Sequence, residues 1–160
     1  MTQIQATAPQ LKLHTVAEVL FVSCRMEESA IALYQRALMI CSDEIRPAIE
    51  RILQDEQSHL CRFRSFGVNN ALSPERTAEL SLYAEQILYK GGLLGAVRDG
   101  LLNSKDSLLK LAARSEAESM QLYRDFAKIA KDDVKNALLL IADEEELHLH
   151  DLEKQLQTTV

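Results

Sequence analysis

Hydrophobic residues recur at intervals of three and four along most of this 160-residue chain, which is the spacing of amphipathic helices. No stretch shows the two-residue alternation that is typical of a half-buried strand. The pattern predicts an all-α protein with a single domain over residues 1–160. Its four long helices form two pairs, at about 15–67 and 104–157, joined by a crossover over about 68–103.

The helix ends have local signals of their own. Thr15 and Glu18 have the spacing of a capping box, which predicts that the first helix begins at Thr15 and runs to about residue 41. Asp43 and Asp132 stand at the same place in each pair and are predicted to cap the second helix of that pair. Gly67 is predicted to end the second helix.

The crossover is predicted to contain an extra helix of its own. Ser73 and Pro74 form a cap followed by proline in the first turn, and the helix should extend to about Lys90. Residues 93–102 are a candidate for a further helix, although Gly95 and Gly100 disfavour it. A connection of this length joins two helix pairs as a crossover and not as a tight turn.

Each half of the chain carries the pattern Glu-x6-Tyr-x21-Glu-x2-His, and the two copies are 89 residues apart. The acids fall on the hydrophobic stripes, where a helix bundle normally places leucine. An ionised carboxylate in such a position is costly unless a cation accompanies it. The two copies consist of Glu27, Tyr34, Glu56 and His59, and of Glu116, Tyr123, Glu145 and His148.

Four carboxylates and two histidines distributed over four helices are the ligand set of a di-metal carboxylate bundle. In each Glu-x-x-His pair the two side chains are neighbours on the helix, so each metal receives one histidine. Glu27 and Glu116 are predicted as terminal carboxylate ligands. Mixed oxygen and nitrogen ligation with open positions favours iron or manganese over zinc. Tyr34 and Tyr123 are predicted to donate hydrogen bonds to ligand carboxylates, and ordinary core packing is the competing interpretation.

A metal-free bundle is the alternative to this interpretation. Its interior acids would be neutralised by Arg25 and Arg114, which also repeat at the same offset. Cys24, one turn before Glu27, is a weaker candidate for a functional thiol. Five acids flank the predicted ligands and are expected to point outward: Glu28, Asp55, Glu118, Glu144 and Glu146.

Composition narrows the classes of function. The net charge is −6 and no face gathers Lys and Arg, which argues against nucleic-acid binding. No hydrophobic run approaches the ~18–20 residues of a membrane span. Cys24, Cys41 and Cys61 form no C-x-x-C pair, so no rubredoxin-type or zinc-ribbon site is expected. The first residues lack the pattern of a signal peptide, and scattered cysteines fit reduced thiols, so a cytoplasmic location is expected.

Four segments carry a resemblance to a known group of proteins: EESAIALY (27–34), DEQSH (55–59), EAESMQLY (116–123) and DEEELH (143–148). Through them the chain resembles the ferritin-like superfamily, and within it the rubrerythrin-like di-iron proteins. The resemblance implies a left-handed four-helix bundle with a crossover between its second and third helices. It also implies two irons held by Glu27, Glu56, His59, Glu116, Glu145 and His148.

Two features depart from typical rubrerythrins. The cysteines of a rubredoxin domain are missing, and Ala113 stands where those proteins carry a further glutamate one turn before the third-helix ligand. The remaining six-ligand set resembles the ferritin or bacterioferritin type. The resemblance implies an oxidoreductase that reacts with O2 or hydrogen peroxide and takes electrons from an external donor. A ferroxidase or iron-binding module and a metal-free structural bundle are the alternatives, and a homodimer is expected from the resemblance alone.

Overall fold

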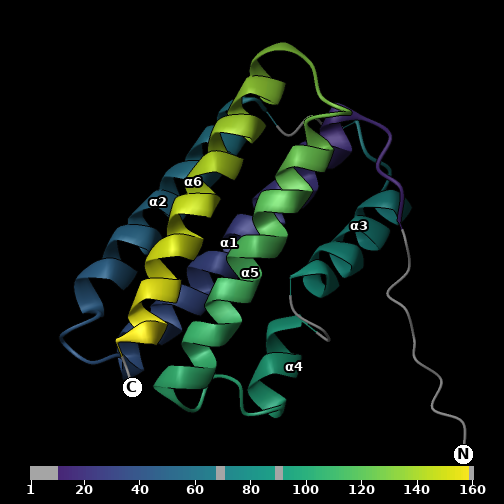
Figure 1. Cartoon of the computed structure of the whole chain (residues 1–160). Coiled ribbons are helices and arrows are strands. Elements are labelled where there is room, and N and C mark those ends of the chain that lie inside the picture. The colour runs from purple at the N-terminus through teal and green to yellow at the C-terminus, as the bar shows by residue number, and fades with distance from the viewer. Residues whose placement is uncertain (1–10, 68–70, 89–91, 159–160) are drawn as a thin grey trace, which may run out of the picture.

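The computed structural model describes residues 11–67, 71–88 and 92–158, and all regular elements within them are helices. In order along the chain the helices are α1 (Val16–Ile40), α2 (Arg46–Ser65), α3 (Pro74–Ile87), α4 (Gly92–Arg98), α5 (Lys105–Phe126) and α6 (Asp132–Gln157). The four long helices lie side by side as a bundle, and α3 and α4 lie at its flank (Figure 1). The prediction of an all-α chain is confirmed.

The bundle consists of two closely packed pairs, α1 with α2 and α5 with α6. The pairs meet along α1 and α5 and, less extensively, along α2 and α6. Figure 1 shows the short connection within each pair and the longer path through α3 and α4 between the pairs. Since each pair comes from one copy of the sequence repeat, the two copies face each other across the bundle interior.

The crossover is fixed to the beginning of α1. Helix α3 starts as predicted, with the Ser73 side chain accepting a hydrogen bond from the Arg76 N–H. The Arg76 guanidinium then contacts Glu18 of α1, with Nε 2.6 Å from Oε1, and donates to the Lys12 carbonyl at 2.8 Å. Helix α4 spans seven residues, shorter than the predicted 93–102, and Gly100 follows it with a positive φ of 72°. The predicted end of α3 near Lys90 lies outside the described residues.

The helix starts give a mixed result. The capping box of Thr15 and Glu18 is present, and the helix stop at Gly67 is confirmed, with a φ of 77°. The predicted caps Asp43 and Asp132 are wrong, since neither α2 nor α6 has a side-chain cap. At α2 a backbone turn takes that role, because the Ser42 carbonyl accepts hydrogen bonds from the N–H groups of residues 45 and 46.

Leucine, isoleucine and alanine fill most of the space between the four long helices. Tyr34 and Tyr123 are the largest side chains that are almost fully buried there, and Tyr123 packs against Phe63 and Phe126 with ring centroids 5.5 and 6.2 Å apart. In the described part of the chain, no helix combines the length and hydropathy that crossing a bilayer requires. The interior is therefore a packed hydrophobic core, interrupted at one level by polar side chains.

Candidate metal centre

That polar level holds the six residues predicted as metal ligands. Each has a relative exposure between 1% and 5%, although all six are acids or histidines. Every long helix contributes to the cluster: α1 carries Glu27, α2 carries Glu56 and His59, α5 carries Glu116, and α6 carries Glu145 and His148. The helix positions that would bury leucine in an ordinary bundle here bury a set of metal-ligand side chains.

The six side chains form two overlapping groups of four. One group is Glu27, Glu56, His59 and Glu145, and the other is Glu56, Glu116, Glu145 and His148. In each group one ligand atom per residue lies within 4.8 Å of all the others. Glu56 and Glu145 belong to both groups, which is the arrangement of two carboxylates shared between neighbouring cations. Each group adds one histidine and one carboxylate of its own.

Every one of the six residues also keeps one buried polar atom without a hydrogen bond. These atoms are Glu27 Oε2, Glu56 Oε1, His59 Nδ1, Glu116 Oε2, Glu145 Oε1 and His148 Nδ1. They lie close together without hydrogen-bond geometry, for example His148 Nδ1 at 3.1 Å from Glu56 Oε1 and His59 Nδ1 at 3.3 Å from Glu145 Oε1. Because an unpaired buried polar atom is costly, a set of six pointing at one another indicates atoms that a ligand is meant to satisfy.

The two tyrosines hold the terminal carboxylates from the opposite half of the chain. The Tyr34 hydroxyl donates to Glu116 Oε1, and the Tyr123 hydroxyl donates to Glu27 Oε1. In each carboxylate the other oxygen, Oε2, is the one left unpaired. The predicted hydrogen bonds are present, and they run between the two repeats rather than within one. Each tyrosine thus fixes the direction in which a carboxylate presents its remaining oxygen.

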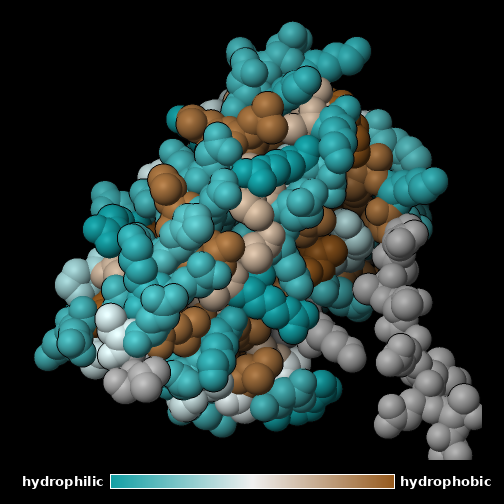
Figure 2. Space-filling model, viewed as in Figure 1, coloured by the Kyte–Doolittle hydropathy of each residue, from teal (hydrophilic) through white to brown (hydrophobic). Residues whose placement is uncertain are grey.

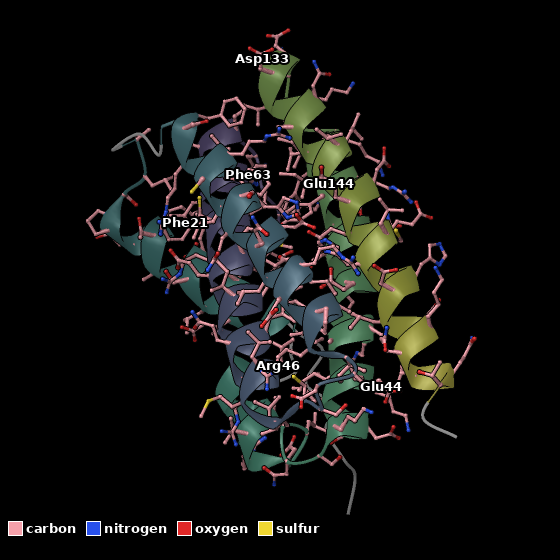
Figure 3. All side chains as sticks on the ribbon, turned by 90° about the vertical axis from the view of Figure 1, so that its left-hand side faces the viewer. Phe21, Glu44, Arg46, Phe63, Asp133 and Glu144 are labelled. Carbon is pink, nitrogen blue, oxygen red and sulfur yellow. The ribbon has the colours of Figure 1, made fainter. Side chains whose placement is uncertain are left out.

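The two histidines are oriented by acids that were expected to face away. His59 Nε2 lies 2.7 Å from Glu144 Oε2, and His148 Nε2 lies 3.1 Å from Asp55 Oδ2. The outward orientation predicted for Asp55 and Glu144 is therefore wrong. A carboxylate can only accept, so each imidazole donates from Nε2, which directs Nδ1 toward the cluster. Figure 3 shows Glu144 on α6 beside α2.

The remaining flanking acids behave as predicted. Glu28 pairs with Arg25 and Arg64, and Glu118 pairs with Arg114, in each case on the surface. Since Arg25 and Arg114 are occupied there, with side chains 42% and 62% exposed, they do not neutralise the interior acids. The metal-free alternative required Arg25 and Arg114 as counter-charges for the interior acids, and the structure does not place them there. Glu146 likewise pairs with an arginine, Arg124, at 3.0 Å.

Crowding of acids shifts the pKa values of the cluster. Burial, followed by the charges of the other carboxylates, raises the pKa of both Glu56 and Glu145 well above the usual value. Burial alone would also raise the pKa of Glu116, but its close contacts with Glu145 and His148 and the hydrogen bond from Tyr34 lower it. Burial and mutual repulsion thus favour the protonated forms of the two shared carboxylates.

The pKa values of the two histidines shift in the direction opposite to the one that burial alone would produce. Burial lowers the pKa of an imidazole, yet contact with Glu27 and the neighbouring carboxylates raises the pKa of His59 to about 9. The pKa of His148 is raised as well, through Glu116, Glu145 and Glu56. Protons thus supply the positive charge that four clustered carboxylates require, and a metal ion would have to displace them.

The donor set fits two divalent cations. Four carboxylates balance the charge of two such ions, and six unpaired atoms in two overlapping groups provide carboxylate and imidazole ligands of the kind that iron and manganese accept. Ala113 adds no seventh ligand, and it is buried. Burial raises the pKa of the Cys24 thiol to about 11, so this cysteine is a protonated and inert core residue at neutral pH.

Comparisons with family models, with curated proteins and with solved structures find no match to this chain.

Proposed function

We propose that the chain is a di-metal carboxylate protein of the ferritin-like type, and that it acts as a non-haem di-iron oxidoreductase on O2 or hydrogen peroxide. The observation that carries the proposal is the set of six inward-facing ligand atoms without hydrogen bonds, one from each predicted ligand. The resemblance of the four motif segments to rubrerythrin-like proteins supports the same reading. Manganese is the alternative metal, because it accepts the same oxygen and nitrogen donors.

The burial of the cluster favours a small oxidant. All six ligand side chains are at most 5% exposed, so an organic substrate does not reach them in this conformation. Two surface hollows, of about 560 Å³ beside Arg51 and Leu147 and about 190 Å³ beside Arg25 and Glu85, are lined by none of the six ligands. Two iron ions held by these residues would supply two one-electron changes, the number needed to reduce hydrogen peroxide to water.

The chain's own residues prepare the site for that chemistry. Tyr34 and Tyr123 fix one oxygen of each terminal carboxylate and leave the other free. The outer acids fix the tautomer of the two histidines. The buried surroundings exclude bulk water and raise the strength of every charge interaction inside. The imidazoles would connect the cluster with solvent: Nδ1 of His59 and of His148 face Glu145 and Glu56, and their Nε2 atoms contact Glu144 and Asp55, whose side chains are 41% and 47% exposed.

Metal analysis and rapid mixing test the proposal together. Purified protein loaded anaerobically with Fe(II) should hold two ions per chain and should oxidise them with peroxide or O2 faster than iron in buffer alone. Glu56→Ala should hold fewer ions, since Glu56 is in both groups of ligands. If wild type and Glu56→Ala show the same low metal content, the chain is a metal-free bundle and the proposal is wrong.

A ferroxidase or iron-binding role is the second candidate, and Ala113 favours it. Typical rubrerythrins, which the chain resembles, carry a glutamate at this position, whereas the six-ligand set resembles the ferritin type. In that case Fe(II) itself is the substrate, and no external electron donor is needed. Repeated additions of Fe(II) and O2 distinguish the two: a ferroxidase passes on or stores many irons, while an oxidoreductase stops after two per chain unless a reductant is supplied.

A further inference from the structure

Outside the cluster, the two halves of the chain differ on the outer faces of α2 and α6. Leu139, Leu140 and Leu147 of α6 are 39%, 46% and 64% exposed. The residues 89 positions earlier on α2 are Glu50, Arg51 and Ser58, which are also exposed. The metal cluster uses both helices in the same way, so it does not explain three exposed leucines on one of them. Figure 2 shows hydrophobic side chains reaching the surface among polar ones on the face that contains α5 and α6.

Two of the three exposed leucines, Leu140 and Leu147, belong to a regular stripe. Its members follow one another at alternating steps of three and four residues, and all of them are exposed: Asp133, Asn136, Leu140, Asp143, Leu147, His150 and Lys154. This is the heptad spacing with which one helix packs along another. The same positions of α2 hold Glu44, Pro47, Arg51, Gln54, Ser58, Cys61 and Ser65, which offer no large hydrophobic side chain. This exposed stripe, called the seam below, faces away from the bundle and places Leu140 and Leu147 seven residues apart among polar side chains.

We propose that this seam is the contact surface for a second copy of the chain, with the two α6 helices antiparallel about a twofold axis between Asp143 and Glu144. The register follows from the sequence: Leu140 meets Leu147 of the partner subunit, and the twofold repeats that contact. Asp133 then lies opposite Lys154 of the partner subunit, at both ends of the seam. A parallel arrangement would place Asp133 against Asp133 and Lys154 against Lys154, so the charges select the antiparallel one.

The centre and the ends of the seam fit this arrangement. Asp143 lies next to the axis in each chain, and Arg124 of the same chain accompanies it, with Nη2 3.6 Å from Asp143. The surface hollow of about 560 Å³ is lined in part by Leu147, His150 and Lys154. In the antiparallel register the N-terminal half of the partner subunit's α6 lies over that hollow. The stripe from residue 133 to 154 is about 33 Å long at ~1.5 Å per residue, enough for an extended helix–helix contact.

Light scattering during size-exclusion chromatography tests the surface. The wild-type chain, 18.0 kDa as a monomer, should elute as a dimer of about 36 kDa at micromolar concentration. The double variant Leu140→Glu/Leu147→Glu should be monomeric while keeping the same helical circular dichroism. The matched control is Leu82→Glu, because Leu82 of α3 is exposed to a similar degree, 61%, but lies off the seam. The control should remain dimeric.

A charge exchange tests the register. Asp133→Lys and Lys154→Asp should each weaken the dimer by roughly tenfold at low salt, since each places like charges together at both ends of the seam. The double exchange should restore wild-type affinity. A monomeric wild type, a dimer that survives the two leucine replacements, or a double exchange no tighter than the single ones would each overturn the proposal. None of these outcomes depends on metal, so the proposed function is tested separately.

Discussion

The helix pairs α1–α2 and α5–α6 are alike on the inside and different on the outside. Inside, each pair contributes a tyrosine, two glutamates and a histidine, and the two sets interlock across the bundle. Outside, α2 is polar where α6 exposes three leucines. The two copies of the repeat have therefore kept the same residues in the interior, where both contribute to one cluster. On the surface the copies are free to differ.

The largest effect is expected from breaking the shared part of the interior. Glu56→Gln and Glu145→Gln should each lower the affinity for both ions, because these two carboxylates belong to both ligand groups. Glu27→Gln should lower the affinity chiefly at one position, since Glu27 belongs to a single group. Calorimetric titration and metal analysis should give contents that fall toward zero for the first two variants and toward one ion for the third. Equal loss in all three would contradict the shared arrangement.

Metal removal should have the next largest effect, and it should depend on pH. The raised pKa values of Glu56 and Glu145 mean that the folded metal-free chain loses stability as pH rises above the unfolded value of 4.5. The pKa of His59, which is raised to about 9, adds a loss of stability between pH 6.5 and 9. The lowered pKa of Glu116 has the opposite effect on stability, and that effect changes only below pH 4.5.

Metal ions replace these protons, so the difference in melting temperature between loaded and metal-free protein should widen from pH 6 to pH 9. At metal concentrations of 100 to 1,000 times the Kd it should reach about 5–15 °C. Differential scanning calorimetry across that range makes the measurement. A difference that narrows with rising pH would mean that protons and metal do not compete for the same atoms.

The outer acids allow a finer comparison between the two halves. Asp55→Asn and Glu144→Gln remove the charge that orients each histidine and should weaken metal binding by about 10- to 100-fold. The effect of Glu144→Gln should be larger, because its contact with His59 is shorter, 2.7 Å against 3.1 Å for Asp55 and His148. Glu118→Gln is the control, since Glu118 pairs with Arg114 on the surface. Sequential titration of the two ions reports which position has weakened.

The smallest effect concerns the helix starts. Thr15→Ala removes a complete capping box and should lower the free energy of unfolding by about 1 kcal/mol. Asp43→Ala should change it by only a few tenths of a kcal/mol, because Asp43 caps nothing and sits in an exposed turn. Urea denaturation of the metal-free proteins measures both. If Asp43→Ala lowered the free energy of unfolding as much as Thr15→Ala, Asp43 would have to cap α2 after all, which would contradict the structure.

The repeat explains why the cluster could be found from sequence and its outer acids could not. Glu27, Glu56 and their counterparts interrupt hydrophobic stripes, and this departure from the pattern is visible in one dimension. Asp55 and Glu144 stand one residue before a predicted ligand, about a quarter turn off the hydrophobic stripe. Each contacts a histidine on the other helix, Asp55 with His148 and Glu144 with His59. Their signal was the single acid directly before each Glu-x-x-His, repeated at the same offset.

The caps failed for a different reason. A side-chain cap requires its residue to lie just before the first helical turn, and a connection of a few residues can place that turn in several ways. After α1 the chain makes a backbone turn around Ser42, which leaves Asp43 three residues before the first residue of α2. Asp132 is already inside α6 and has a φ of 48°. Helix periodicity is a long-range average, whereas a cap depends on single dihedral angles.

Anomalous diffraction tests the central claim most directly. Crystals of the protein loaded with Fe(II) or Mn(II), measured at the edges of those elements, should show two peaks per chain inside the bundle. Both peaks should contact Glu56 and Glu145, with His59 and Glu27 at one and His148 and Glu116 at the other. An interior without anomalous density, in crystals whose metal sits only on surface carboxylates, would contradict the account.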